Sequence, residues 1–287
     1  MKQYNDLLKR ILLEGTQQSN RTGIDTIFIP GAMMQFDLAA GFPAVTTKKL
    51  AWNAVKGELI GFLRGYTNAA EFRELGCKIW DQNANENQAW LDNPNRKGHD
   101  DLGKIYGSIW RSYPAYNKPN IDQINELLMS IYNNPTNRRM IVDAWRPDMF
   151  DQMALPPCHV LYQFLANVET KQLHLCMYQR SADMFLGVPF NIASASLFLT
   201  IIAKLTGYKP ATFTHFLADA HIYVNHIEQV KEQIGRQCYP LPELLYSGPT
   251  YDGTNQFTSS VFDSILPEHF QLLHYKHHPT IKAAMAV

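Results

Sequence analysis

The sequence predicts a single α/β (α+β) domain, residues 1–287, in which helices flank a mixed, mainly antiparallel sheet. The chain has 287 residues, and 46% of them are hydrophobic, which is ample material for one packed core. Helical and strand periodicities alternate along the chain. We find no internal repeat and no linker rich in Pro, Gly or Ser, so a second domain is not indicated.

The first half of the chain shows both periodicities. Apolar residues at helical spacing predict helices at 1–15, 53–64 and 121–132, each closed by a Gly or Pro. Residues 26–37 are rich in β-forming residues around Pro30-Gly31, which predicts a bent or bulged strand pair. The polar stretch 83–103 contains Pro94, Gly98 and five Asn residues, so we expect a long surface loop there.

The second half alternates between short strands and helices. We expect strands at 139–145, 159–168, 172–180 and 212–218, with a polar turn at 169–171 between the second and third. Helices are expected at 191–205 and 219–235. The apolar stretch 192–205 is interrupted by polar residues such as Ser194, Thr200 and Lys204, which favours a buried helix over a membrane span.

Composition excludes several classes of protein. Lys+Arg and Asp+Glu both total 26, giving a net charge of zero, so nucleic acid is not expected as the main substrate. The four cysteines are scattered without a CxxC motif, so we expect neither a disulfide framework nor a metal site. Residues 1–15 lack the apolar core of a signal peptide. A cytoplasmic protein with no membrane partner is the expectation.

The strands at 159–168 and 172–180 predict one specific contact. If the turn lies near Thr170, paired residues have numbers that sum to about 338–340, which places Cys158 opposite Arg180. A guanidinium beside a thiol lowers the pKa of the thiol and favours a reactive thiolate. The alternative is a buried structural cysteine, but Pro156-Pro157 hold the chain extended just before Cys158 and weaken it.

Two further titratable residues stand out. His159 follows Cys158 on a strand, so its side chain should point to the opposite face and not form a thiolate–imidazolium pair. His159 could orient water or a ligand, and a purely structural histidine is about as well supported. Glu58 lies at the edge of an apolar helical stripe, where burial would raise its pKa. It is either a general acid/base or a partly exposed edge residue.

Three arginines are candidates for phosphate binding. Arg21 lies in a turn-like segment, and Arg138-Arg139 follow Pro135. The guanidinium fork suits phosphate, although solvation at the surface explains most isolated arginines.

Taken together, these motifs resemble the thymidylate synthase family, in the family's order and over the whole chain. The most specific blocks are Leu155-Pro-Pro-Cys-His159, Tyr178-Gln-Arg-Ser181, and Phe185-Leu-Gly-Val-Pro-Phe-Asn-Ile-Ala-Ser194. Further matching segments are Arg21-Thr-Gly23, Gly41-Phe-Pro-Ala-Val-Thr-Thr-Lys-Lys49, Ile79-Trp-Asp81, Tyr106-Gly107, His221-Ile-Tyr223 and the C-terminal segment 278–287.

The resemblance implies a homodimer packed through its sheets and a reaction between dUMP and 5,10-methylenetetrahydrofolate, the folate co-substrate. The Cys158 thiolate would add to C6 of the pyrimidine and make C5 nucleophilic, and C5 would then attack the one-carbon unit.

The resemblance also implies a role for each site residue. Glu58, Tyr106 and His159 would manage proton transfer, while Arg180 would assist the Cys158 thiolate. The phosphate would be bound by Arg21, Arg180 and Ser181, with Arg138 and Arg139 reaching across from the partner subunit. The rest of the nucleotide would contact Asp183, Asn191, His221 and Tyr223. The folate would contact Ile79, Trp80, Asn83, Asp183, Leu186, Gly187 and Phe190, and Ala286-Val287 would close over it.

Asn191 should select the base. An amide can donate to O4 and accept from N3–H of uracil, whereas an aspartate is expected in the related cytidylate hydroxymethylases. Asn191 therefore indicates dUMP. A helix-capping role for Asn191 is compatible with this interpretation.

Several positions depart from the synthase pattern, and most of them fall in motifs that line the pocket. They are Gly61, Asn83, Lys104, Asp143, Arg146, Ala195 and the segment 217–220. Losing indoles at 61 and 83 while gaining Asn83, Asp143 and Arg146 should loosen folate packing and admit water. We therefore expect a deoxyuridylate hydroxymethylase that makes 5-hydroxymethyl-dUMP.

Two alternatives to the hydroxymethylase remain open. One is a thymidylate synthase that makes dTMP and dihydrofolate, with a compensated repacking around the intact Trp80. The other is a folate, nucleotide or RNA binder without turnover. The run 42–52 is similar to phage sequences, so a phage-encoded protein acting in the host cytoplasm is also expected.

Overall fold

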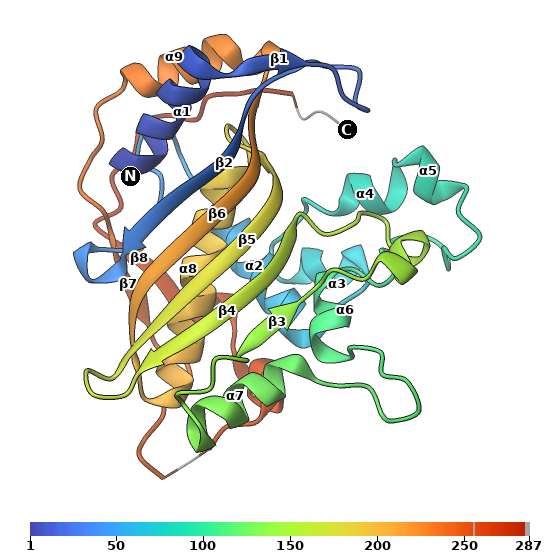
Figure 1. Cartoon of the computed structure of the whole chain (residues 1–287), viewed down its shortest axis with the longest axis vertical. Helices are drawn as coiled ribbons and strands as arrows, with labels where there is room; N and C mark the ends of the chain where they lie inside the picture. The colour runs from blue at the N-terminus through green and yellow to red at the C-terminus, as the bar shows by residue number, and fades with distance from the viewer. Residues whose placement is uncertain (255, 285–287) are drawn as a thin grey trace.

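The chain forms one α/β domain with a mixed sheet flanked by helices, as the sequence predicts (Figure 1). The computed structural model describes residues 1–254 and 256–284. The main sheet has six strands in the order β1-β2-β6-β5-β4-β3. Its strands are β1 (Thr16–Gln18), β2 (Thr26–Asp37), β3 (Ile141–Asp143), β4 (His159–Asn167), β5 (Gln172–Asp183) and β6 (Lys209–Tyr223). Neighbouring strands in it are antiparallel except β5 and β6, which are parallel.

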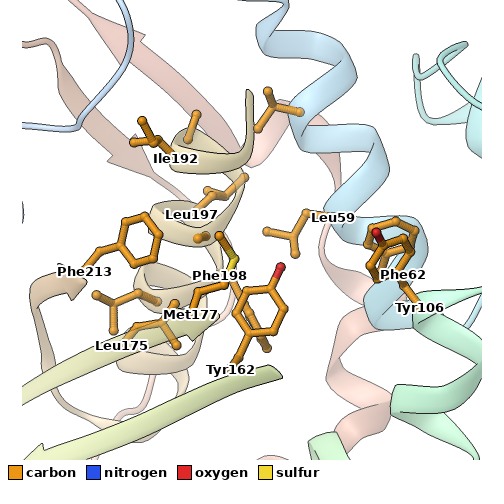
Figure 2. Close-up of a cluster of buried hydrophobic side chains, with 14 of the residues drawn as sticks. Leu59, Phe62, Tyr106, Tyr162, Leu175, Met177, Ile192, Leu197, Phe198 and Phe213 are labelled. Carbon is orange, nitrogen blue, oxygen red and sulfur yellow. The ribbon is translucent and has the colours of Figure 1, made fainter. Parts of the chain in front are cut away.

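The core lies between this sheet and two helices, α2 (Trp52–Arg64) and α8 (Gly187–Thr206). Helix α8 packs directly on β5 and β6, and α2 packs on α8. Figure 2 shows Leu59 of α2 pointing toward Leu197 and Phe198 of α8, with Met177 of β5 beneath them. Of the most apolar 18-residue stretch of α8, 83% is buried inside the fold, which confirms the prediction of a buried helix.

The opposite face of the sheet is open and apolar within the part of the chain that the structure describes. No described helix covers β4, β5 and β6 on the face turned toward the viewer in Figure 1. Met33, Tyr178 and Phe216 project from adjacent strands there and are 60%, 42% and 39% exposed. Such a contiguous patch on a sheet is typical of a protein–protein contact.

Smaller elements surround this core. The remaining helices are α1 (Lys2–Glu14), α3 (Ala69–Glu74), α4 (Asp81–Asn85), α5 (Gln88–Leu91), α6 (Tyr106–Arg111), α7 (Gln123–Asn133) and α9 (Ile227–Gly235). Short 3-10 helices lie at Leu38–Ala40, Pro147–Gln152, Val224–His226, Ser259–Ser264 and Pro267–His269. Strands β7 (Glu243–Tyr246) and β8 (Phe270–Leu273) form a separate two-stranded sheet.

The register of the hairpin from β4 to β5 confirms the predicted contact. His159 pairs with Gln179, and Tyr162 pairs with Met177. The backbone N–H of Arg180 donates to the carbonyl oxygen of Cys158 at 2.9 Å. Cys158 therefore lies opposite Arg180 at the open end of the hairpin.

Three predicted elements differ from the structure. Residues 219–223 belong to β6 and not to a helix, because they continue the pairing with residues 26–30 of β2, where Ala220 and Ile222 are fully buried. Residues 26–37 form one strand and not a strand pair, and this strand keeps the same register with β6 on both sides of Gly31 (φ 64°). The polar stretch 83–103 carries helix α5 and part of α4, anchored by the fully buried Trp90 indole, whose N–H donates to the carbonyl of Asp101.

Candidate active site

Cys158 lies at the end of the sheet, just before β4, with its thiol beside a positive charge. Nη2 of Arg180 lies 3.9 Å from its Sγ. The guanidinium is held in place because it donates to the carbonyl oxygens of Pro157 (2.8 Å) and Pro156 (3.2 Å). The ring of Trp145 packs against the guanidinium, 5.5 Å from its carbon. The two prolines and the indole thus fix the cation next to the thiol.

Opposing effects act on the thiol. Burial raises the pKa of Cys158 and outweighs the positive charges of Arg180 and then Arg21, which lower it. The pKa of the thiol is therefore raised overall, and not lowered as the sequence predicts. Both guanidinium groups favour the thiolate form of Cys158 over the thiol, and an anion bound between them would weaken this effect. The charges of the two arginines thus act in the direction that a nucleophilic cysteine requires, against the effect of burial.

Tyr106, the first residue of α6, contacts the backbone of Cys158. The backbone N–H of Cys158 donates to Oη of Tyr106 at 2.7 Å. Burial raises the pKa of Tyr106 well above its usual value, so the hydroxyl keeps its proton. Because its oxygen is already an acceptor, this proton is available to a neighbouring water or ligand.

His159 points away from the thiol, as strand alternation predicts. Its Nδ1 lies 3.1 Å from Oη of Tyr162, and its ring stacks obliquely near Tyr106, with centroids 5.5 Å apart. Burial lowers the pKa of His159 to about 4, opposed by a hydrogen-bonding contact with the side chain of Asn191. His159 is therefore a neutral polar group at the edge of the site.

Asn191 is held by two residues that the sequence did not single out. Nε2 of Gln179 donates to Oδ1 of Asn191 at 3.1 Å and to the carbonyl of Ser181 at 2.9 Å. Nε2 of His215 lies 2.8 Å from Oε1 of Gln179. Gln179 stands inside the recognised block at 178–181, so its position was available from the motif, whereas nothing in the local sequence around His215 marks it.

Glu58 lies inside the fold and not at an exposed edge. It is 5% exposed, and the Trp80 indole N–H donates to its Oε1 at 3.0 Å. Burial raises the pKa of Glu58 to about 8, and the hydrogen bond from Trp80 partly opposes this. The carboxyl group can thus take up or release a proton near neutral pH.

A second group of polar residues gathers where β5 and β6 run side by side. Asp183 pairs with His221 in the sheet, and Nδ1 of His221 lies 3.0 Å from Oδ1 of Asp219. Oδ1 of Asp183 accepts hydrogen bonds from the backbone N–H groups of Phe185 (2.9 Å) and Leu186 (3.2 Å). The carboxylate thereby fixes the turn that leads into α8.

Tyr223 and Ser181 extend this group. Ser181 pairs with Asp219 between β5 and β6, which places it at the same end of the sheet as His221. Burial raises the pKa of Tyr223, and the nearby charges of Asp183 and Arg21 act on it in opposite directions. The turn that carries Arg21 therefore reaches the same end of the sheet.

The residues expected around the folate lie on two segments. Ile79 is exposed and Trp80 is buried, while Asn83 on α4 is half-buried. Leu186 and Phe190 are half-buried at the start of α8, where Gly187 leaves room near Asn191 and Asp183. Ala286 and Val287, expected to close the site, lie outside the described residues.

Arg138 and Arg139 are not brought to Cys158 within one chain. Both side chains are exposed in the turn between α7 and β3. The carbonyl of Arg138 accepts a hydrogen bond from the Gln163 side chain. Gln163 lies five residues beyond Cys158 on β4, roughly 16 Å along an extended strand.

The structure corrects the expectation that the departures at 61, 143 and 146 open the pocket to water. A Cβ at Gly61 would lie 2.3 Å from the ring of Phe72, which is fully buried and fills that space. Arg146 donates to Asp148 and to the carbonyl of Pro114, and its guanidinium stacks on Tyr113. Oδ1 of Asp143 accepts from the N–H of Trp145. These groups are engaged in structural contacts.

A metal site was not expected, and among residues 1–254 and 256–284 no group of three or more His, Cys, Asp or Glu side chains is placed to hold an ion.

The fold and the site define a class: a mixed-sheet domain that holds a cysteine thiol beside an arginine, with buried titratable side chains nearby. Comparison with known proteins agrees. The thymidylate synthase family model matches residues 2–287. Thymidylate synthases from Pseudomonas putida, Pseudomonas syringae pv. tomato and Bordetella bronchiseptica are 45%, 44% and 43% identical over 323 aligned positions, which cover 100% of both chains. The chain belongs to the thymidylate synthase family. These relatives are bacterial and give no support to the expected phage origin.

Proposed function

We propose that the protein is a thymidylate synthase, which converts dUMP to dTMP while 5,10-methylenetetrahydrofolate becomes dihydrofolate. The observation that carries this choice is the packing around Gly61. Phe72 occupies the space of the missing indole, and Trp80 remains buried against Glu58. A closely packed aromatic wall at this point favours hydride transfer from the folate over attack by water. The names of the full-length relatives support the same choice.

In the proposed reaction, the Cys158 thiolate forms a bond to C6 of the uracil, and the electron pair moves to C5. C5 then bonds to the one-carbon unit of the folate. Arg180 is placed to stabilise the thiolate at 3.9 Å and to contact the phosphate. Loss of the C5 proton expels the folate nitrogen from the one-carbon unit, and hydride transfer to the exocyclic methylene gives the methyl group. The C5–C6 double bond then re-forms and expels the Cys158 thiolate from C6, which releases dTMP and regenerates the enzyme.

We assign proton transfer to Glu58, Tyr106 and His159. Glu58 has a pKa raised to about 8 by burial, which suits a group that exchanges protons near neutral pH. Tyr106 contacts the backbone of the nucleophile and retains a free hydroxyl proton. His159 is neutral and orients the network, because its pKa is lowered by burial.

The nucleotide is proposed to bind along the end of β5 and β6. Arg21, Arg180 and Ser181 would bind its phosphate, and Asp183, His221 and Tyr223 would hold its sugar. Asn191 would read the uracil edge. The folate would then lie over the nucleotide against the residues at 79, 80 and 83 and the start of α8, including Leu186, Gly187 and Phe190, with Ala286 closing over it.

We also infer a homodimer that packs through the open sheet face, with Arg138 and Arg139 completing the phosphate site of the partner. The exposed Met33, Tyr178 and Phe216 support a dimer contact through this face of the sheet. The exposure of Arg138 and Arg139 supports their contribution to the phosphate site of the partner. A mixture of a Cys158→Ala chain with a chain carrying Arg138→Ala and Arg139→Ala tests this. Each alone should be inactive, whereas subunit exchange should restore about a quarter of wild-type activity. No recovery after verified exchange would contradict shared sites.

The hydroxymethylase remains the second candidate, favoured by one observation. Asn83 replaces an aromatic residue of the family pattern and is half-exposed on α4, three residues beyond Trp80. An amide there can bind a water molecule close to the folate. The action of either enzyme is proposed to take place in the cytoplasm.

The experiment is to incubate the protein with dUMP and methylenetetrahydrofolate and identify the nucleotide by mass. The proposed function predicts dTMP with one equivalent of dihydrofolate, detected by its absorbance. The Cys158→Ala variant should give no product. Formation of 5-hydroxymethyl-dUMP would favour the second candidate, and binding without turnover would refute both enzymes.

A further inference from the structure

We propose that His215 is a positioning residue that makes the site selective for uracil over cytosine, acting through Gln179 on the amide of Asn191. The inference rests on the proposed function, because it concerns how that site reads its base. His215 is fully buried on β6, beside Met177 in the register with β5, and Gln179 is 2% exposed.

The orientation of the Gln179 amide follows from its contact with Ser181. A backbone carbonyl oxygen only accepts hydrogen bonds, so the amide nitrogen must face it, at 2.9 Å. Oε1 of Gln179 must then be the atom that faces Nε2 of His215, at 2.8 Å. The distance between these two atoms is that of a good hydrogen bond.

This contact fixes the tautomer of His215. Oε1 is an acceptor, so Nε2 must carry the proton. Burial lowers the pKa of His215 to about 3, so the ring carries one proton only. Nδ1 is then a bare lone pair, and it has no hydrogen-bond partner among the described residues. An unpaired buried acceptor is tolerated more readily than an unpaired N–H group, which agrees with this tautomer.

The same chain of contacts determines which end of Asn191 is left to donate. Gln179 donates its second N–H to Oδ1 of Asn191 at 3.1 Å, so Nδ2 of Asn191 remains a donor. Uracil presents an acceptor at C4, the O4 oxygen, and cytosine presents an amino donor there. The fixed amide therefore suits uracil and opposes cytosine, while the second lone pair of Oδ1 can accept from N3–H.

His215 matters because it satisfies the oxygen of Gln179. Without that donor, Oε1 is buried and unpaired, which drives the amide to rotate toward another partner. Asn191 then loses its fixed orientation and can offer either end to the base. A histidine that merely fills the core would alter folding stability or the affinity for both nucleotides, but not their ratio.

The experiment measures dissociation constants of dUMP and dCMP for the full-length protein and three variants. His215→Phe removes the donor, while His215→Gln keeps an N–H group. His226→Phe is the matched control, since His226 is equally buried but bonds to the Ala284 carbonyl. The preference for dUMP should fall about tenfold in His215→Phe and stay within about threefold in the other two.

A folded His215→Phe protein with the wild-type preference would overturn the inference alone. A wild-type protein that binds neither nucleotide would overturn the proposed function as well. If His215→Phe does not fold, ¹⁵N NMR of the wild-type histidines gives the answer. A proton on Nε2 of His215 supports the inference, and a proton on Nδ1 overturns it.

Discussion

The indole nitrogen of Trp80 donates a hydrogen bond to Oε1 of Glu58 over 3.0 Å, and both side chains are buried. Burial raises the pKa of Glu58 to about 8, while the hydrogen bond stabilises the carboxylate and limits that rise. Trp80 thus belongs to the wall of the proposed folate site and also tunes the acidity of Glu58. This one hydrogen bond therefore couples the wall of the proposed folate site to the proton affinity of Glu58.

Replacing Trp80 should change the pH dependence of the enzyme. Trp80→Phe keeps an aromatic wall but removes the donor, so the pKa of Glu58 should rise further. The limb of the pH–rate profile that reports Glu58 should move to higher pH by about 0.5–1 unit. Trp90→Phe is the control, because its indole bonds to the Asp101 carbonyl instead. If this limb does not shift in Trp80→Phe, the titration of Glu58 does not determine the pH–rate profile.

Glu58 should also make the fold less stable at high pH. Its pKa in the folded state, about 8, exceeds the ordinary value of 4.5, so the folded state holds a proton that the unfolded state has lost between these values. The free energy of unfolding therefore falls as pH rises across this range. Glu58→Gln should be more stable than wild type by roughly 2–4 kcal/mol at pH 9, with little difference at pH 4. Urea denaturation at both pH values measures this, and a pH-independent difference would disprove it.

Arg180 should control the reactivity of Cys158. Arg180→Gln removes the cation nearest the thiol, so the pKa of Cys158 should rise above its already elevated value. Alkylation of Cys158 by iodoacetamide at pH 7.5 should slow about three- to tenfold. Mass spectrometry of the peptide that contains Cys158 distinguishes it from the other cysteines. Arg146→Gln, whose guanidinium stacks on Tyr113, should leave the rate unchanged.

The packing of Gly61 predicts a stability effect. Gly61→Ala places a Cβ 2.3 Å from the Phe72 ring and should destabilise the fold by about 1–3 kcal/mol. Combining it with Phe72→Leu should cost less than the sum of the two single changes, because the smaller side chain relieves the clash. Gly235→Ala is the control, since nothing lies within 4 Å of its added Cβ. Equal tolerance at 61 and 235 in urea denaturation would contradict the close packing.

Asn191 should determine the base. Asn191→Asp replaces the Nδ2 donor by an acceptor, so the ratio of kcat/KM for dCMP to that for dUMP should rise by at least about tenfold. Steady-state rates with each nucleotide measure this ratio. If the Asp variant keeps the preference for dUMP, Asn191 does not read the base.

Some of the site could be predicted because it depends on local rules. The hairpin arithmetic placed Cys158 opposite Arg180, and strand alternation turned His159 away from the thiol. The strand at 219–223 does not follow from the local sequence, because the residues that pair with it, 26–30 of β2, lie far away along the chain. His215 escaped notice because its partner Gln179 lies 36 residues away on a neighbouring strand. Likewise, the Phe72 ring fills the space beside Gly61 only in the folded structure. The residues next to Gly61 in the sequence therefore do not predict it.

The most direct test of the proposed synthase follows the hydride. The protein is supplied with dUMP and methylenetetrahydrofolate that carries deuterium at the C6 position of the folate ring. Transfer of this hydride to the exocyclic methylene predicts dTMP heavier by one mass unit, with one equivalent of dihydrofolate. Recovery of 5-hydroxymethyl-dUMP without deuterium, together with labelled tetrahydrofolate, would contradict the account.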